Sequence, residues 1–396
     1  EYRSQQVRAP FQRRCFVVKV VAIDMPAGDA FVNVLKQVWD SGDAVLPIDQ
    51  RLPKVAQKKL MSQFNVSSLI GADGLKTKIA PGEPVDEGDA LVIATSGSTG
   101  EPKGVVHTHD SINAAVTKTG ARLGCSATDH WLACISLAHV GGLSVVLRAL
   151  HFGSQLTIES RADKATIESA AKNGADMTSL VPTILHSVDI SNFRAVLVGG
   201  AHAPTNLPSN AISTYGLTET FGGVVYNGKP IDGVEICIGT DSEIKIRCDS
   251  LLRTYRNGND PKDSEGWLHT GDLGRLQDGD LTVLGRKDDL IKTGGYKVWP
   301  ITVENSLRQH DAVVDVVVAG TPDEKWGQTV TAWVVLRPGT KSVRLEDLNK
   351  HVRLTLSDYC APKKVFIVDE IPRSSLGKAL ISDLVQPHNK FKALHE

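Results

Sequence analysis

A stretch rich in glycine and hydroxyl side chains, Thr95 to Gly104, constrains the fold of this 396-residue chain more than any other. It follows an apolar run of strand type, 89–94, and contains three glycines, four hydroxyls and one lysine, Lys103. Glycine lets backbone N–H groups approach an anion closely, while hydroxyls and lysine add donors and positive charge. The pattern predicts a loop that wraps the phosphates of a nucleotide. An ordinary Ser/Gly-rich turn is the alternative, and Pro102 departs from the common P-loop ending.

The composition says more about the partners of the chain than about its chemistry. The length predicts at least two domains, and 41% hydrophobic and 22% charged residues are ordinary for a globular protein. A formal net charge of -1 predicts no general attraction to nucleic acid or membrane, and no apolar run approaches the roughly 20 residues of a membrane span. The six cysteines form no Cys-x-x-Cys pair, which predicts reduced thiols, a cytoplasmic protein and no zinc site. The chain starts at Glu1, so its natural start is expected to be missing.

Apolar periodicity alternates between helix and strand along the chain, which predicts an α/β fold. Helices are expected at 31–38, 54–64 (with Val55, Leu60 and Phe64 inward), 112–123, 143–152 and 162–173. Strands are expected at 44–48, 131–137, 155–158, 177–181 and 193–198, and a hairpin from 235–238 and 243–247. A break at 286–289 precedes a last unit of about 100 residues with strand, helix and strand patterns, the size of a small domain.

Three histidines lie near these elements. His107 and His109 are two residues apart, but no third ligand follows, which favours a hydrogen-bonded histidine beside the loop over a metal pair. His139 lies at the exit of a predicted strand, before Gly141–Gly142. That position suits the lining of a pocket and equally a satisfied core histidine.

Polar groups also gather after the predicted strand 193–198. Gly199-Gly200-Ala201 would let a flat ligand approach the backbone, and 213–220 reads as a turn with an exposed tyrosine, threonines and the carboxylate Glu219. These groups suit a nucleotide and Mg²⁺, although a tyrosine in a turn is commonly just packed. Asp272 is expected in a loop, where it would bind a pair of hydroxyls or serve as a turn residue. Near the end of the chain, Lys378 follows a glycine on a turn, where a solvated lysine is the ordinary interpretation.

Together these motifs resemble the acyl-CoA synthetase, adenylation-domain and luciferase superfamily of adenylate-forming enzymes. The matching stretches are Thr95–Gly104, Tyr215–Glu219, Trp267–Asp272, Gly285–Gly295 and Pro372–Lys378. A narrower resemblance, to the short actinobacterial-like 2-succinylbenzoate–CoA ligases of menaquinone synthesis, rests on 137–144 and 221–233. The short segment before the central loop also indicates a compact subgroup.

The resemblance implies a fold and a reaction. It implies an α/β protein with a large N-terminal domain of stacked mixed sheets and helices at 1–285, a hinge at 286–289 and a small mobile α+β domain at 290–396. In the first half-reaction a carboxylate attacks the α-phosphate of ATP, giving an acyl-adenylate and pyrophosphate. In the second, a thiol, usually that of coenzyme A, displaces AMP. Neither step needs a protein nucleophile, so the residues position substrates and neutralise charge.

The same resemblance implies a role for each matching residue. The phosphate loop would comprise Thr95, Ser96, Gly97, Ser98, Thr99, Gly100 and Lys103. The adenine would be bordered by Gly200, Ala201, Tyr215 and Gly216, and the ribose bound by Asp272 with Arg286 nearby. Thr218 would reach the α-phosphate, and the Mg²⁺ ligands would be Glu219 and Thr99. Asp288 would be the hinge position, Lys378 the adenylation lysine, and His139 a gate of the acyl pocket. After rotation of the small domain, the thiol channel would be lined by Lys292, Gly294 and Gly295.

Three classes of function stay open at this point. The first is a carboxylate–CoA ligase using ATP, Mg²⁺ and coenzyme A on 2-succinylbenzoate or on a fatty or aryl acid. The second is an adenylating enzyme that loads a carrier-protein thiol, although no carrier domain is present. The third, a nucleotide-binding protein without catalysis, is disfavoured because Lys103, Glu219, Asp272 and Lys378 are all retained. No nucleic acid or membrane span is expected, and a homodimer is left open.

Overall fold

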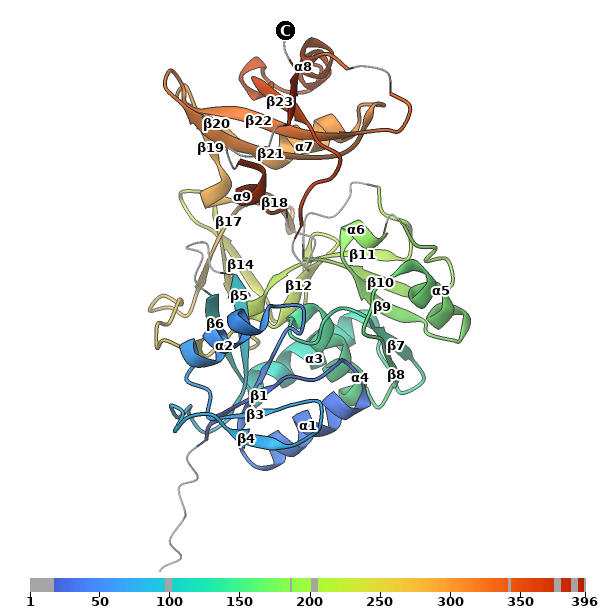
Figure 1. The fold of residues 1–396 in the computed structure, drawn as a ribbon, viewed down its shortest axis with the longest axis vertical. Helices are drawn as coiled ribbons and strands as arrows, with labels where there is room; N and C mark the ends of the chain where they lie inside the picture. Colours follow the sequence, from blue (N-terminus) through green and yellow to red (C-terminus); the bar gives the residue numbers. More distant parts are fainter. Residues whose placement is uncertain are drawn as a thin grey trace, which may run out of the picture.

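The computed structural model describes residues 18–96, 102–185, 187–200, 206–340, 343–373, 379–385 and 391–394. The chain forms two bodies (Figure 1): a larger one, coloured blue to yellow, and a smaller one, orange to red. Four β-sheets organise the described residues, three in the larger body and one in the smaller. No helix in this described part is long and apolar enough to cross a membrane.

The first sheet has the central hairpin near one edge. Its strands, in spatial order, are β16 (Thr254–Tyr255), β6 (Pro102–Thr108), β5 (Asp89–Ser96), β2 (Ala44–Pro47), β1 (Val20–Ile23), β3 (Ser68–Ile70) and β4 (Lys76–Lys78). Helices α1 (Asp29–Asp40) and α2 (Lys54–Gln63) connect its parallel strands. The inward placement of Leu60 and Phe64 is confirmed, but that of Val55 is wrong, because Val55 is 81% exposed. Gln57 and Leu60, three residues apart, form the buried stripe of α2, and Val55 lies on another face.

The second sheet carries most of the glycine-rich strand ends. Its strands, in spatial order, are β13 (Lys229–Pro230), β12 (Gly222–Tyr226), β11 (Ala211–Leu217), β10 (Ala195–Val198), β9 (Met177–Leu180), β7 (His130–Ala133) and β8 (Gln155–Ile158). Its helices include α3 (His109–Leu123), α4 (Val140–Phe152), α5 (Lys164–Lys172) and the single turn α6 (Pro182–Leu185). One apolar cluster, which includes Leu91, Ile112, Leu143 and Trp131, joins both sheets through α3 and α4.

The predicted strand 131–137 is too long, since β7 ends at Ala133. The chain then turns back tightly, with His139 N–H donating to the Ser136 carbonyl oxygen at 3.1 Å. A side chain on Gly142 would overlap the carbonyl oxygen of Ile135, so the start of α4 lies directly against this turn. Only glycine allows this close approach, which leaves His139 just before the helix.

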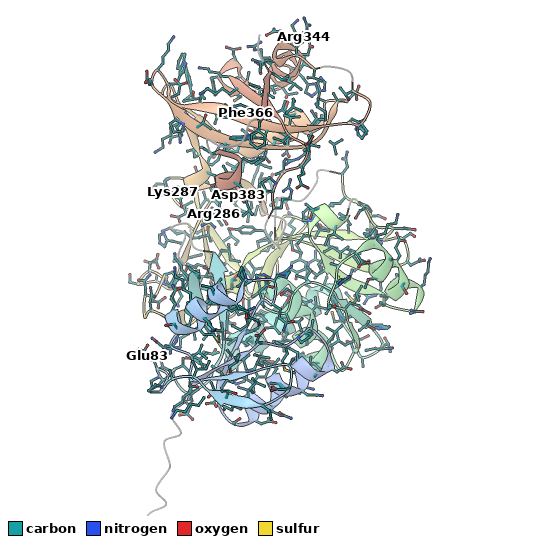
Figure 2. The ribbon with its side chains drawn as sticks, viewed as in Figure 1. Glu83, Arg286, Lys287, Arg344, Phe366 and Asp383 are labelled. Carbon is teal, nitrogen blue, oxygen red and sulfur yellow. The ribbon has the colours of Figure 1, made fainter. Side chains whose placement is uncertain are left out.

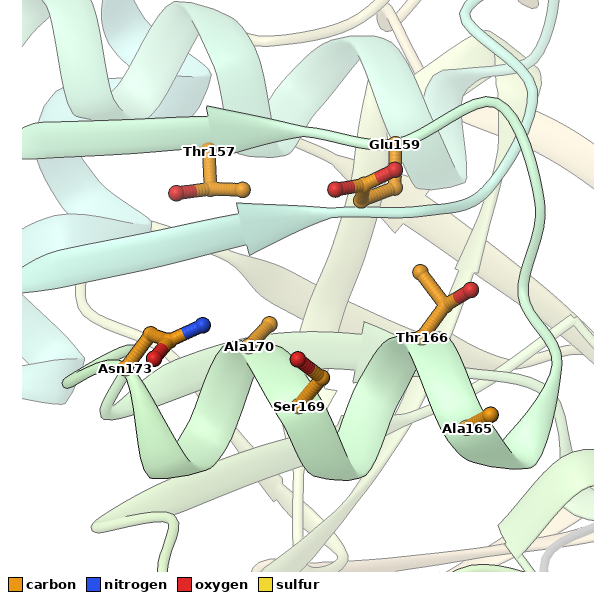
Figure 3. Close-up of a pocket in the computed structure, with 7 residues that line it drawn as sticks. All are labelled: Thr157, Glu159, Ala165, Thr166, Ser169, Ala170 and Asn173. Atoms are coloured by element: carbon orange, nitrogen blue, oxygen red, sulfur yellow. The ribbon is translucent and has the colours of Figure 1, made fainter.

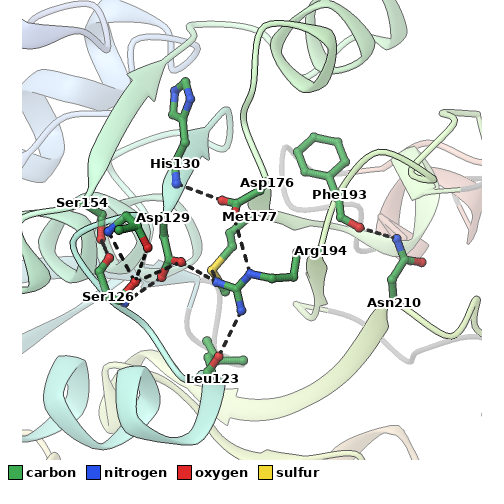
Figure 4. Close-up of polar contacts among 11 residues, drawn as sticks. Leu123, Ser126, Asp129, His130, Ser154, Asp176, Met177, Phe193, Arg194 and Asn210 are labelled. Atoms are coloured by element: carbon green, nitrogen blue, oxygen red, sulfur yellow. Dashed lines mark hydrogen bonds and ion pairs between the residues drawn. The ribbon is translucent and has the colours of Figure 1, made fainter.

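Arg194 ties the amino-terminal ends of three parallel strands together (Figure 4). Its guanidinium contacts Asp129 at 2.8 Å and Asp176 at 3.4 Å, and Asp176 accepts from the His130 backbone N–H at 2.8 Å. These residues immediately precede or begin β7, β9 and β10. The opposite, carboxyl-terminal ends of the strands are therefore left for a ligand, as is usual in parallel sheets.

A third sheet links the large body to the small one. Its strands are β14 (Glu235–Ile238), β15 (Glu243–Arg247), β17 (Leu268–Gln277) and β18 (Asp280–Arg286). The predicted hairpin is confirmed, with Ile238 opposite Ile244. The prediction of a loop around Asp272 is wrong, because Asp272 lies within β17, directly opposite Arg286 of β18. The glycine before it, Gly271, has φ of +71°, so it bends the strand without ending it.

The small body has a sheet and an apolar core of its own. The sheet contains β19 (Ile291–Thr293), β20 (Tyr296–Val298), β21 (Val313–Asp323), β22 (Gly327–Leu336), β23 (Lys364–Ile367) and β24 (Lys392–Leu394). Helices α7 (Pro300–Arg308), α8 (Leu345–Arg353) and α9 (Ile381–Val385) accompany it. Strands β22 and β23 are parallel and joined through α8, which confirms the predicted strand–helix–strand unit. Val303, Val318 and Leu348 belong to a core separate from that of the large body.

Candidate functional site

The Thr95–Gly104 loop is the tip of the β5–β6 hairpin. Thr95 lies opposite Lys103 and Ser96 opposite Pro102, while Gly97, Ser98, Thr99 and Gly100 lie outside the described residues. A side chain on Gly104 would lie 2.9 Å from the Arg256 side chain and 3.0 Å from that of Val92. This glycine therefore lets the base of the hairpin pack closely, which fixes where Lys103 emerges.

Lys103 and Glu219 meet through a tyrosine that the sequence interpretation missed. The Lys103 ammonium lies over the Tyr255 ring, 5.0 Å from its centroid. The Tyr255 hydroxyl donates to Glu219 Oε1 at 2.8 Å. Burial and the neighbouring Glu219 carboxylate raise the pKa of Tyr255 above its usual value, so the phenol stays protonated and donates. The loop lysine and the predicted metal ligand thus share one site.

The backbone at Thr218 and Glu219 is held from two sides. His107 Nε2 donates to the Thr218 carbonyl oxygen at 2.7 Å, and the Leu252 N–H donates to that of Glu219 at 2.7 Å. Burial lowers the pKa of His107 to about 4, so the ring is neutral at pH 7 and carries its proton on Nε2. The prediction of a hydrogen-bonded histidine beside the loop is confirmed for His107; His109 begins α3 instead.

Tyr215, Asp272 and Arg286 form a second group. The Tyr215 hydroxyl donates to Asp272 Oδ2 at 2.9 Å, and Arg286 Nη1 lies 3.2 Å from Asp272 Oδ1. Tyr215 belongs to β11 and is half-buried, so its placement in an exposed turn is wrong. Burial first, and then the Asp272 charge, raise the pKa of Tyr215. The three strands β11, β17 and β18 therefore converge on one carboxylate.

Glycines allow close packing at the neighbouring strand ends. A side chain on Gly216 would overlap the Gly222 carbonyl oxygen, and one on Gly199 would lie 2.5 Å from the Thr214 hydroxyl. Gly200 follows β10 with φ of +82°, a conformation that favours glycine. Ala201 lies outside the described residues. Gly199 and Gly216 thus let neighbouring strands pack closely beside Tyr215.

His139 is held by a buried carboxylate. Its Nε2 lies 3.3 Å from Asp49 Oδ2, and Arg51 binds the same carboxylate through Nε and Nη2, each at 2.8 Å. Although burial opposes ionisation, the hydrogen bonds from His139 and Arg51 hold the pKa of Asp49 well below its usual range. One turn along α4, Ser144 lies next to Gly222, 3.8 Å from the position of an added side chain. The structure thus brings the first turns of α4 and the start of β12 together.

Arg148, on the same face of α4 as Ser144, is a buried cation that no motif indicated. It is 3% exposed, its Nε donates to the Thr119 hydroxyl at 3.1 Å, and its guanidinium lies 5.0 Å from the Trp131 ring centroid. Its Nη1 is buried and has no hydrogen-bonding partner in the described part of the chain. A buried donor without a partner is costly, so an anion would complete this site. The available signal was a charge inside the otherwise apolar run 145–150.

The predicted hinge and thiol-channel residues lie where the two bodies meet and in the small body. Arg286 and Lys287 are labelled at that junction in Figure 2, and Lys287 pairs with Asp241 at 2.6 Å. Asp288 lies in a single 3₁₀ turn, η2 (Lys287–Asp289). The exposed hairpin after it includes Lys292, Gly294 and Gly295, the glycines with φ of +56° and +85°. A side chain on Gly294 would lie 2.5 Å from the Trp326 ring.

Lys378 lies outside the described residues, but the base of its segment is defined. The described residues on either side of it, Arg373 and Ala379, form an antiparallel bridge. Arg373 Nη2 binds both carboxylate oxygens of Asp315, at 2.9 and 2.7 Å. Arg373, the last described residue before Lys378, is therefore anchored to β21.

A separate polar cavity of about 390 Å³ lies between β8 and α5 (Figure 3). It is lined by Thr157, Glu159, Ala165, Thr166, Ser169, Ala170 and Asn173. None of the predicted site residues lines it, so it plays no part in the site described above.

Comparison with known proteins identifies the family of this chain. Residues 17–247 match the model of the AMP-binding enzyme family, and residues 302–378 match that of the AMP-binding enzyme C-terminal domain. The chain therefore belongs to the AMP-binding enzyme family, which confirms the resemblance carried by its motifs.

Two relatives and one solved structure are similar to this chain over most of its length. The chain is 37% identical over 345 residues to a probable 2-succinylbenzoate–CoA ligase of Mycobacterium tuberculosis (strain ATCC 25618 / H37Rv), covering 81% of this chain and 88% of the relative. It is 30% identical over 409 residues to the 2-succinylbenzoate–CoA ligase of Bacillus subtilis (strain 168), covering 93% and 83%. A Bacillus subtilis o-succinylbenzoate CoA synthetase solved with its acyl-adenylate intermediate aligns with a TM-score of 0.82 and 26% identity, over 93% of this chain and 88% of that one.

Proposed function

We propose that this protein is an AMP-forming 2-succinylbenzoate–CoA ligase. The observation that carries the proposal is contact between residues far apart in sequence: Lys103 and Glu219 both contact Tyr255, and Asp272 contacts Tyr215, four residues before Glu219. The two relatives above, named as a probable 2-succinylbenzoate–CoA ligase and a 2-succinylbenzoate–CoA ligase, support it. The substrates would be ATP, coenzyme A and a carboxylic acid.

The nucleotide would lie across the glycine-lined strand ends. The Tyr215 ring would cover one face of the adenine, with Gly200, Ala201 and Gly216 at its border. Asp272, already paired with Arg286, would accept from the ribose hydroxyls. The loop from Thr95 to Lys103 would hold the β- and γ-phosphates, and Thr218 would reach the α-phosphate.

Glu219 fits the needs of a magnesium ion. Mg²⁺ binds with one or two carboxylates, waters and substrate phosphates rather than with a cage of protein ligands. No group of three or more metal-binding side chains occurs among the described residues, so a metal here would depend on the nucleotide. Glu219 and Thr99 would hold the ion, which would neutralise charge on the phosphates when bound.

The reaction would proceed in two displacements. A carboxylate oxygen attacks the α-phosphorus of ATP, and the bond to the pyrophosphate oxygen breaks. Lys378 would lie between the carboxylate and the α-phosphate in this step. The coenzyme A sulfur then attacks the acyl carbon, the thiol proton is lost, and AMP leaves with the electrons of the C–O bond. His139 would gate the acyl pocket between the steps.

A rotation of the small domain would serve the second step. We place the domains at 1–285 and 290–396, with the hinge at 286–289 centred on Asp288. Rotation would withdraw Lys378 and bring Lys292, Gly294 and Gly295 beside the thiol channel. The separate core of the small body supports such a motion.

Arg148 is the observation that supports the choice of acid. 2-Succinylbenzoate has two carboxylates, and the ring carboxylate is crowded by its ortho acyl group. The flexible succinyl carboxylate would therefore be activated, leaving the ring carboxylate to pair with the buried Arg148 guanidinium. A fatty acid or simple aryl acid would leave this cation unpaired. We further propose a cytoplasmic location, supported by the five free cysteines of the described residues.

A panel of acids tests the proposal. Purified protein with ATP, Mg²⁺ and coenzyme A should release AMP with 2-succinylbenzoate and much less with benzoate or fatty acids. AMP release with a fatty or simple aryl acid, and none with 2-succinylbenzoate, would support an AMP-forming ligase but would show that 2-succinylbenzoate is not its substrate. Thioester formation on a carrier protein but not on coenzyme A would show that coenzyme A is not the acceptor.

A further inference from the structure

Tyr255 belongs to a short strand that nothing in the loop motif indicates. It lies in β16, opposite Val105 of β6, at the edge of the first sheet. Lys103 is two residues before Val105 on β6, so both side chains leave the strand on the same face. This register places the Tyr255 ring beside the Lys103 ammonium, which lies 5.0 Å from the ring centroid.

The hydroxyl end of the same ring reaches Glu219. It donates to Oε1 at 2.8 Å, and Tyr255 is only 8% exposed, so water competes weakly for this bond. Among the described residues, Glu219 Oε2 has no hydrogen-bonding partner. One carboxylate oxygen is thus fixed by the phenol, while the other remains to bind a ligand.

The geometry points to Tyr255 as a positioning residue that joins the phosphate loop to the metal-binding carboxylate. Its ring would hold Lys103 by a cation–π contact, and its hydroxyl would orient Glu219 toward Mg²⁺ bound to ATP. This role rests on the function proposed above, because it assigns Glu219 to the metal. Tyr255 itself touches neither metal nor reacting atoms in this arrangement; it acts through its two neighbours.

Two substitutions separate the two contacts. Tyr255→Phe keeps the ring under Lys103 and removes only the hydroxyl bond to Glu219. Tyr255→Leu removes both contacts while keeping an apolar side chain in the buried position. Tyr359→Phe, an exposed tyrosine stacked on Tyr296 in the small body, serves as the matched control.

Isothermal titration calorimetry of ATP, with Mg²⁺ and with EDTA, supplies a readout independent of turnover. We expect Tyr255→Phe to weaken ATP binding about tenfold with Mg²⁺ and to leave binding in EDTA as in wild type, since only the orientation of Glu219 is lost. Tyr255→Leu should in addition weaken binding in EDTA about threefold, because Lys103 is released. Tyr359→Phe should behave as wild type in both conditions.

The outcomes distinguish the inference from the proposed function. Wild-type affinity of Tyr255→Phe in the presence of Mg²⁺ would overturn the role of the hydroxyl. An equal loss with Mg²⁺ and with EDTA in Tyr255→Phe would indicate a merely structural tyrosine and would also overturn it. Wild-type protein that binds ATP equally with and without Mg²⁺ would instead contradict the assignment of Glu219 in the proposed function.

Discussion

Replacement of Arg148 by methionine separates the stability of the fold from recognition of the acid. Arg148 is 3% exposed, and its Nη1 has no partner within the described residues. Methionine has a similar length and no polar atoms to satisfy. The variant would lose the hydrogen bond from Nε to Thr119, which lowers stability. It would also lose a buried and incompletely paired charge, which raises stability. We therefore expect the free energy of unfolding to fall by no more than about 1 kcal/mol, or to rise.

The effect on substrate binding should be much larger. Truncating one partner of a buried, hydrogen-bonded charge pair costs about 2–5 kcal/mol, and about 3 kcal/mol corresponds to roughly a hundredfold change in affinity. We expect Arg148→Met to raise KM for 2-succinylbenzoate by this factor. Benzoylpropionate, which keeps the succinyl arm and lacks the ring carboxylate, should be used equally by both proteins.

The assay is AMP release at varied acid concentration, with urea unfolding of the same preparations. Arg122→Met, which removes an exposed arginine from the last turn of α3, is the matched control and should match wild type. The proposed role of Arg148 is refuted if Arg148→Met loses activity on both acids equally, because the arginine would then support the fold or the chemistry in general. It is also refuted if KM for 2-succinylbenzoate is unchanged.

Three further predictions test other parts of the site. Asp272→Asn should raise KM for ATP about tenfold, because it weakens the acceptor of Tyr215 and the partner of Arg286; an unchanged KM would contradict the ribose role. Burial lowers the pKa of His107 from 6.5 to about 4. Between these two pH values the unfolded chain binds a proton at His107 that the folded chain does not bind. Wild type should therefore lose roughly 3 kcal/mol of its free energy of unfolding as the pH falls from 6.5 to about 4. His107→Gln, which keeps a donor but does not titrate, should show a flatter urea-unfolding profile against pH; equal slopes would refute this. Lys378→Ala should abolish ATP–pyrophosphate exchange yet still convert a supplied acyl-adenylate to thioester, and equal loss of both steps would reject its role.

Local patterns in the sequence were sufficient for much of the fold. Helices α1, α3 and α4 follow from apolar spacing and from the glycine that ends α3 at Gly124, whose φ is +64°. The β14–β15 hairpin follows from alternation on both sides of a turn. Each of these signals depends on residues within a few positions of one another, which is why it can be read from one sequence.

The errors at Asp272 and Tyr215 arise where glycine has a role other than ending an element. Gly271 suggested a loop around Asp272, but in β17 it bends a strand that continues past it. Tyr215 was expected in a turn because of Gly216, yet that glycine is required by the close approach of β12. Sequence alone does not say whether a glycine breaks a strand or lets a neighbour approach.

The site itself depends on contacts that no local pattern contains. Tyr255 and Glu219 are separated by 36 residues, and Tyr255 reaches Lys103 only because β16 pairs with β6. Arg148 belongs to no motif, and its one local signal, a charge within an apolar run, does not show that the side chain is buried. The motifs indicated the proposed nucleotide end of the site, whereas the proposed acid end depends on the packing of α4 against β12.

The most direct test of the account is ATP–pyrophosphate exchange measured without coenzyme A. We predict that 2-succinylbenzoate and Mg²⁺ together support exchange, and that adding coenzyme A then yields the thioester and AMP. Exchange absent with every acid tested, or release of ADP in place of AMP, would contradict the assignment of this chain as an adenylate-forming ligase.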